Sequence, residues 1–233
     1  MSSLVNITQT TNADFASKGF LSKIYGFMVI GLAISTIASF VTLSNPAVVQ
    51  TLASNSILYF GLIGIQIALA LYVQWMVQKS SALTSGLLFV VYSVLNGVTL
   101  SLVLLMYTAT SVVSILALAT VMYAALAALG HFEIVDISGW GGFLAMATFG
   151  ILGAALLNMW MQSPVFNTII SMVAMVVFSL LTIFDARAYK DMESSIADNT
   201  TRQRMIVLGA LHMYMNFIVL FTSLLNLFGS REE

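Results

Sequence analysis

The stretch LGALHMYMNFIVLF, residues 208–221, decides the fold class, because it is apolar enough to cross a membrane yet contains a histidine and an asparagine. His212 and Asn216 are four positions apart, so they lie on the same face of a helix with about 3.6 residues per turn. Lipid offers neither side chain a hydrogen-bond partner. We therefore expect both side chains to face the interior of a helical bundle.

The composition of the whole chain is typical of an integral membrane protein. Of the 233 residues, 60% are hydrophobic and only 7% are charged, and the mean hydropathy is +1.00. These values exceed what a soluble core requires. The net charge of −1 gives no basic surface for nucleic acid, and the absence of cysteine excludes disulfides, thiolate catalysis and cysteine metal sites.

Seven apolar runs are long enough to span a bilayer. A hydrocarbon layer of about 30 Å requires roughly 20 apolar residues in a helix. The runs lie near residues 24–43, 57–77, 83–107, 112–130, 143–161, 165–184 and 206–228. The alternating pattern of barrel strands is missing, and an open sheet would leave backbone groups unpaired in lipid. The sequence therefore predicts an all-α integral membrane protein, a bundle of seven transmembrane helices.

The runs and their short connections predict one transmembrane domain, residues 24–229, between an N-terminal tail, 1–23, and a short C-terminal tail, 230–233. Connections of a few residues force neighbouring helices to run antiparallel and to stay adjacent. The first run is longer than the apolar part of a signal peptide, and no small-residue cleavage site follows it. We expect it to be retained as a helix.

The distribution of basic residues predicts the orientation. Seven of the eight Lys and Arg residues fall in the N-terminal tail and in the connections after the second and sixth runs, and the opposite face has only Arg231. Since positively charged connections stay in the cytoplasm, we expect a cytoplasmic N-terminus and an external C-terminus. The short tail and compact length fit a bacterial inner membrane, although a eukaryotic internal membrane would give a similar sequence.

The longest connection, DARAYKDMESSIADNTTRQRM at residues 185–205, contains four acidic and four basic residues. Its simplest interpretation is a solvated linker whose basic residues set the topology. The alternative is a regulatory surface.

Polar side chains within the spans recur at helical spacing, which indicates faces turned away from lipid. Serine, threonine and asparagine at such positions commonly act as packing contacts worth under about 1 kcal/mol each. Asp185 differs, because a carboxylate at membrane depth costs a few kcal/mol unless it is paired or hydrated. His212 is either a satisfied interior histidine or a protonatable group lining a path.

Motifs for catalysis are missing, so we do not expect an enzyme or a cofactor. The chain has no HExxH, GxSxG or Walker-type sequence. Its lysines all lie outside the spans, which disfavours a retinal Schiff base. His131, Glu133 and Asp136 share a short connection and could hold a metal, but solvated loop residues are the better interpretation.

Four stretches, taken together, resemble the signature regions of the Bax inhibitor family of seven-helix membrane proteins. They are YSVLNGVTLSLVLLMYT (92–108), DISGWGGFLAMATFGILGAALLN (136–158), FSLLTIFDARAYKDM (178–192) and LGALHMYMNFIVLFTSLLNLFG (208–229). The resemblance runs in consistent order from about Lys23 to Gly229, so it covers nearly the whole chain. As a set, the four stretches are specific.

The resemblance implies a bundle in which the seventh helix is central and is wrapped by two layers of three helices. The side chains expected to line the interior are then His212, Tyr214, Asn96 and Thr182. It also implies pH-sensitive passage of calcium down its gradient and, in eukaryotic members, an association with resistance to cell death.

The resemblance further implies a pH sensor made of two aspartates and a basic residue from the second helix. Asp185 matches the first aspartate and Lys79 the basic residue. The family pattern Leu-Tyr-Leu-Asp-Phe reads Met-Tyr-Met-Asn-Phe at 213–217, so Asn216 replaces the second aspartate. Two close carboxylates cannot both ionise freely, and an amide removes that repulsion together with an oxygen that calcium would favour. Any calcium site is expected near Asp185.

Two functions remain open at this point. The first is a passive calcium or cation leak channel with a weakened proton switch, closed by contacts of Asp185 with Asn216, Tyr214 or Lys79. The second is a non-conducting regulatory protein that binds other membrane proteins, such as quality-control proteases. Both place the chain in a lipid bilayer.

Overall fold

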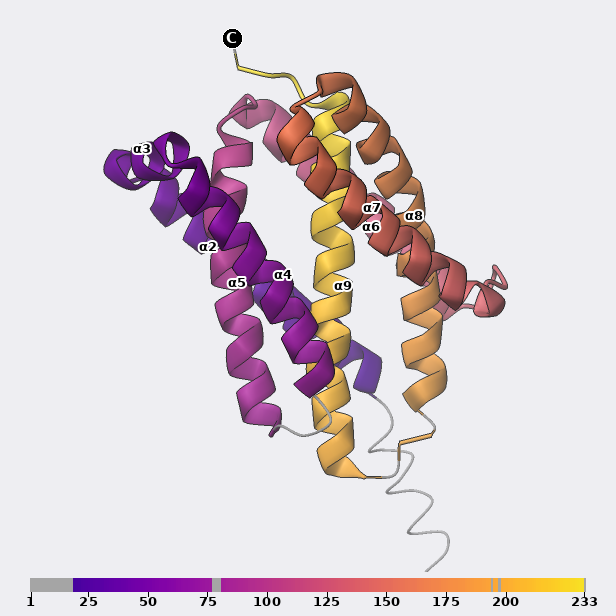
Figure 1. Ribbon diagram of the computed structural model, residues 1–233. Coiled ribbons are helices and arrows are strands. Elements are labelled where there is room, and N and C mark those ends of the chain that lie inside the picture. Colours follow the sequence, from indigo (N-terminus) through magenta and orange to yellow (C-terminus); the bar gives the residue numbers. More distant parts are fainter. Residues whose placement is uncertain (1–18, 77–80, 194, 197, 233) are drawn as a thin grey trace, which may run out of the picture.

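The computed structural model describes residues 19–76, 81–193, 195–196 and 198–232. Within these residues, seven helices are long and apolar enough to cross a membrane, which confirms the predicted all-α membrane bundle (Figure 1). They are α2 (Phe20–Leu43), α4 (Ser56–Met76), α5 (Ala82–Leu104), α6 (Ala109–His131), α7 (Gly141–Met161), α8 (Pro164–Glu193) and α9 (Asn199–Phe228). Two shorter elements are α3 (Pro46–Ser54) and the 3-10 turn η1 (Ser138–Trp140).

Helix α9 runs through the middle of the molecule (Figure 1). Of its most apolar stretch 67% is buried, against 6–39% for the other six long helices. It packs on α2, α5, α6 and α8, while α4 packs mainly on α5 and α7 mainly on α8. Helices α2, α4 and α5 therefore form one group beside α9, and α6, α7 and α8 form another. Their arrangement as two wrapping layers stays a prediction.

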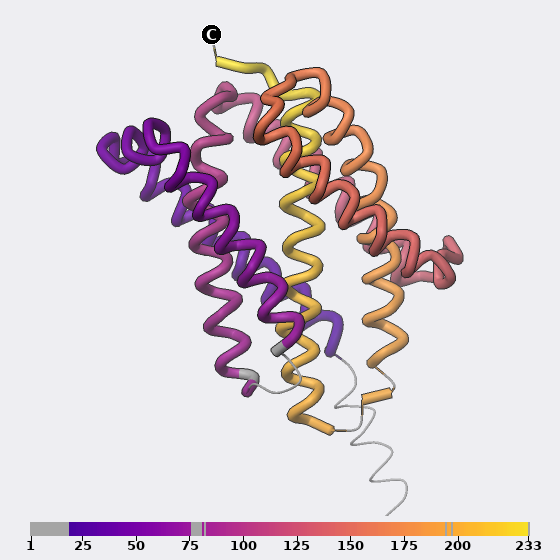
Figure 2. Tube along the Cα trace, viewed as in Figure 1, coloured from indigo at the N-terminus to yellow at the C-terminus, as the bar shows by residue number. Residues whose placement is uncertain are grey.

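The ends of the bundle differ in charge. The starts of α2, α5 and α9 and the ends of α4, α6 and α8 meet at one end, which we call the basic end because Arg187, Lys190, Arg202 and Arg204 lie there. The C-terminus marks the opposite end, as the tube trace in Figure 2 shows. The predicted cytoplasmic side corresponds to the basic end.

The prediction that residues 185–205 form a solvated linker is wrong for most of its length. Residues 185–193 continue α8 and residues 199–205 begin α9, so both helices are 30 residues long. Good helix formers such as Ala186 and Ala188 carry α8 past the membrane, and the Asp198 side chain caps α9 by accepting from the Thr201 amide at 2.8 Å. A 30-residue helix measures about 45 Å and outreaches a hydrocarbon layer of about 30 Å.

The short helix α3 was not predicted, although the sequence carries its start signal. The Asn45 side chain accepts from the Ala47 amide at 3.2 Å, and Pro46 occupies the first helical position. At nine residues, α3 is too short to span the membrane. It connects the end of α2 to the start of α4 (Figure 1).

Small residues bring the helices together. A side chain added at Gly97 of α5 would collide with the backbone of Ser35 in α2, and one added at Gly130 of α6 would collide with the backbone of Ile183 in α8. In lipid, the burial of apolar surface does not drive helices together. Close approach of two backbones instead provides the van der Waals contacts that hold the helices together. These two contacts set the spacing within each helix group.

The C-terminal segment after α9 pairs with the turn between α5 and α6. The Thr108 amide donates to the Ser230 carbonyl at 3.0 Å, and the Glu232 amide donates to the Met106 carbonyl at 3.2 Å. The hydroxyl of buried Tyr107 donates to the Asn226 side chain at 2.8 Å. These bonds fix the end of α9 that lies far from the basic end.

Candidate functional site

The polar pair Asp185 and Asn216 joins α8 to α9 inside the bundle. The Asn216 Nδ2 donates to Asp185 Oδ2 at 2.7 Å, and Asn216 is only 5% exposed. Asn216 precedes the end of α9 at Phe228 by 12 residues, or about 18 Å along the helix. An amide that donates to a carboxylate forms a strong, charge-assisted bond. The pair thus supplies the partly buried carboxyl group of Asp185 with a hydrogen-bond partner.

A second bond links the same helices one turn nearer the basic end. The Tyr189 hydroxyl lies 2.8 Å from His212 Nδ1. Tyr189 follows Asp185 by four residues and His212 precedes Asn216 by four, so the two bonds are successive rungs between antiparallel helices. His212 is therefore a partly buried histidine whose partner is the Tyr189 hydroxyl, one turn from the Asp185–Asn216 pair.

Tyrosines from three helices interact electrostatically with the carboxylate. They are Tyr25 of α2, Tyr123 of α6 and Tyr189 of α8. The Tyr123 hydroxyl donates to the Met213 carbonyl at 3.2 Å. The Tyr25 hydroxyl is buried and has no hydrogen-bond partner among the described residues.

A cleft of about 850 Å³ lies between α2, α6 and α9 and reaches two of these tyrosines. Its walls are mainly apolar and include Tyr25, Tyr123 and Phe217, with His131 and Glu193 at the basic end. Asp185 is not among the lining residues. The cleft therefore reaches two of the tyrosines but not the carboxylate.

The other predicted site residues lie elsewhere. The Tyr214 hydroxyl lies 2.5 Å from Ser35 Oγ of α2, so its partner is a serine and not Asp185. The Asn96 amide donates to the Gln66 side chain at 3.4 Å, between α5 and α4, and the Thr182 hydroxyl donates to the Phe178 carbonyl of its own helix at 2.8 Å. Lys79 lies outside the described residues. Of the predicted site residues that the structure describes, Asn216 contacts Asp185, and His212 lies one helical turn away, where it bonds Tyr189.

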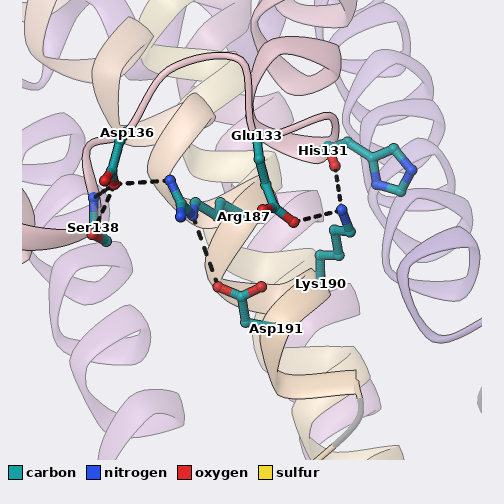
Figure 3. Close-up of polar contacts among 7 residues, drawn as sticks. All are labelled: His131, Glu133, Asp136, Ser138, Arg187, Lys190 and Asp191. Carbon is teal, nitrogen blue, oxygen red and sulfur yellow. Dashed lines mark hydrogen bonds and ion pairs between the residues drawn. The ribbon is translucent and has the colours of Figure 1, made fainter.

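Ion pairs at the basic end hold the connection between α6 and α7 against α8 (Figure 3). Arg187 Nη1 donates to Asp136 Oδ1 at 2.8 Å, and Lys190 Nζ donates to Glu133 Oε1 at 2.7 Å and to the His131 carbonyl at 2.8 Å. Glu133 and Asp136 therefore have separate cationic partners. Among the described residues, no three His, Asp or Glu side chains gather as a metal site would need.

These contacts lower the pKa of both carboxyl groups. The hydrogen bond from Lys190 lowers the pKa of Glu133 below its ordinary 4.5, and the bond from the Ser138 hydroxyl, aided by Arg187, lowers that of Asp136 below its ordinary 3.8. The stabilisation by both ion pairs is therefore fully present at a pH above the ordinary carboxyl pKa values. It is lost as the pH falls through the lowered pKa values of the folded protein.

A spin label attached to cysteine at position 135 should therefore show the same mobility from neutral pH down to the ordinary carboxyl range, and greater mobility only below it. Lys190→Gln should raise the mobility near neutral pH, because it removes one of the two ion pairs. The measurement is the electron paramagnetic resonance line width of the labelled protein in vesicles. A change in line width near neutral pH in the labelled protein that keeps both ion pairs would contradict this prediction.

Comparison with known proteins adds a second line of evidence. The family model described as "Inhibitor of apoptosis-promoting Bax1" matches residues 17–233. The inner membrane protein YbhL of Escherichia coli is 35% identical over 215 residues, covering 91% of this chain and 92% of its own. An uncharacterized protein of Borreliella burgdorferi is 32% identical over 231 residues, covering 99% of this chain and all of its own.

The chain belongs to the Bax inhibitor family. Asp185 and Asn216, the two positions that the resemblance assigned to a sensor, lie in direct contact, and their role as a sensor stays a prediction. The tyrosines around Asp185 were missed from the sequence. Tyr189, one turn after Asp185 on the same face, was the available signal, whereas Tyr25 and Tyr123 come from helices whose placement only the fold reveals.

Proposed function

We propose that this Bax inhibitor family protein is a passive leak channel for cations, calcium among them, in a bacterial inner membrane. The observation that carries the proposal is the 2.7 Å bond between Asp185 and Asn216, which joins the central helix to α8 beside a cleft. A partly buried carboxylate attracts cations, and a bond between two helices can open or close a path as the helices separate. The inner membrane assignment follows YbhL.

The amide at position 216 weakens the response to protons. When Asp185 is ionised, its oxygen accepts from the Asn216 NH₂ group, and when it is protonated its hydroxyl can donate to the Asn216 carbonyl oxygen. Because an amide is both donor and acceptor, the pair stays bonded in either state. The closed arrangement therefore depends less on pH than it would with two carboxylates.

A second function is a regulatory protein that binds other membrane proteins without conducting. The Asn216 amide supports this function too. A pair that stays hydrogen-bonded in both protonation states can act purely as a structural contact between α8 and α9, without gating an ion path. The charged extension of α8 and α9 at the basic end would then offer a surface to a partner.

Calcium flux separates the two functions. The purified protein is reconstituted in vesicles that contain a calcium-sensitive dye, and a calcium gradient is applied. The leak channel predicts a flux that Asp185→Asn reduces severalfold, because the variant removes the anionic group. Asp191→Asn is the matched control, since it removes a more exposed carboxylate from the same helix. Tight vesicles for the unaltered protein would favour the regulatory function.

A further inference from the structure

The connection between α6 and α7 exposes most of its apolar side chains. Phe132 and Ile134 are 68% and 66% exposed, and Val135 and Trp140 are exposed as well, whereas Ile137 is buried. Glu133 and Asp136 are also exposed, but they pair with Lys190 and Arg187 of α8 (Figure 3). A loop in water would ordinarily cover its large apolar side chains, and this one leaves four of them outside.

The ion pairs neutralise the carboxylates of this connection. Lys190 and Arg187 bind Glu133 and Asp136 at 2.7 and 2.8 Å. Each acid is thus paired with a cation of α8. The surface of residues 132–140 therefore combines exposed apolar side chains with paired carboxylates, and it has little net charge to resist contact with the lipid headgroups.

Helix α7 shows where the bilayer lies relative to this connection. Trp140 and Trp160 stand at the two ends of α7, and Trp160 is 90% exposed. Twenty residues of helix separate them, or about 30 Å, which matches the thickness of the hydrocarbon layer. Tryptophan concentrates at both membrane interfaces. Exposed Phe143 and Met146 continue the apolar surface of Trp140 along α7.

We propose that residues 132–140 are an interfacial anchor, whose Phe132, Ile134, Val135 and Trp140 side chains insert among the lipid headgroups at the basic end. The occupant of this surface is lipid because the surface continues the lipid-facing side of α7 and because its acids are neutralised from α8. The anchor links the lipid leaflet to α8 through Arg187 and Lys190. These two residues follow Asp185 on the same helix by two and five positions. The inference does not depend on ion conduction.

The test uses the full-length protein with one tryptophan, Ile134→Trp, after the native tryptophans are changed by Trp75→Phe, Trp140→Phe and Trp160→Phe. The protein is placed in vesicles of phosphatidylcholine and phosphatidylglycerol that contain lipids brominated near the glycerol backbone or near the end of the acyl chain. Iodide in the buffer reports exposure to water. Two references bracket the result: native Trp160 alone for lipid, and Gln203→Trp alone, at an exposed position near the start of α9, for water.

The anchor predicts that the tryptophan at position 134 is quenched severalfold more by bromine near the glycerol than by deep bromine, and severalfold less by iodide than the tryptophan at position 203. Native Trp140 alone should show the same pattern, which covers the case in which Ile134→Trp misfolds. Quenching that matches position 203 would overturn the proposal. Such quenching would mean that residues 132–140 face water when no other protein is present. It would therefore favour a docking surface for a protein partner.

The role of the ion pairs has its own variant. Adding Arg187→Met and Lys190→Met leaves both acids uncompensated, so the connection should move toward water and iodide quenching at position 134 should rise severalfold. Arg231→Met removes a positive charge at the opposite end and should leave the quenching unchanged. An equal, low quenching in all three proteins would show that the pairs do not hold the anchor in place.

Discussion

Asn216→Asp is expected to produce a calcium leak that depends steeply on pH. The substituted carboxylate would take the place of an amide nitrogen that lies 2.7 Å from Asp185 Oδ2. Two carboxylates at that separation share one proton in acid and repel each other when both are ionised. At about 4 Å and an effective dielectric constant of about 20, the repulsion is about 4 kcal/mol. Since about 1.4 kcal/mol changes an equilibrium tenfold, the leak should rise by more than tenfold from acid to alkaline pH.

The exchange variant Asp185→Asn with Asn216→Asp is the matched control for this prediction. It keeps one carboxylate and one amide in contact but exchanges the helices that carry them. Its pH profile should return to the shallow profile of the unaltered protein, because the repulsion is gone. Dye-loaded vesicles measured over a pH series give both profiles, and a shallow profile for Asn216→Asp alone would refute the proton switch while leaving the fold unaffected.

Gly97→Ala is expected to cause the largest loss of stability among single methyl additions in the α2 and α5 pair. The added carbon would meet the carbonyl oxygen and Cα of Ser35 and the side chain of Ala38, and backbone atoms cannot move aside as a flexible side chain can. Overpacking of this kind typically costs about 1–3 kcal/mol. The cost spreads further, since Ser35 also bonds the Ser93 carbonyl at 2.7 Å and the Tyr214 hydroxyl at 2.5 Å.

Gly64→Ala provides the control for the glycine prediction. Gly64 is also in a long helix, but an added carbon there would meet no heavy atom within 4 Å. The substitution should leave stability unchanged or raise it slightly, because alanine is the better helix former. Denaturation in mixed detergent micelles, followed by circular dichroism, measures both variants. Equal denaturation midpoints for Gly97→Ala and Gly64→Ala would show that α2 and α5 can move apart without a loss of stability.

The spans were predictable because hydropathy reports directly on contact with lipid, and seven apolar runs correspond to seven long helices. The helical extension at Arg187 and Lys190 was not predictable. Charged residues end an apolar run in the hydropathy pattern, but they do not stop the backbone from continuing as a helix. The ion pairs of these residues with Asp136 and Glu133 join positions 51 and 57 residues apart in sequence, beyond the reach of any local pattern.

The candidate site was predictable in part for a similar reason. Helical periodicity places His212 and Asn216 on one face, and the family resemblance placed Asp185 opposite them. Periodicity does not say which neighbour a face meets, so Tyr214 was expected near Asp185 but contacts Ser35. Asn96 likewise lies on the α4 side of α5, away from the central helix.

The central place of α9 has a consequence for biogenesis. The ribosome delivers α9 after the six other long helices that the structure describes, so these six are synthesised before the one on which α2, α5, α6 and α8 pack. Until then, the inner faces of those four helices lack their common neighbour. Nascent chains that stop before residue 199 should therefore insert but stay open to intramembrane proteolysis, which would couple completion of synthesis to survival of the protein.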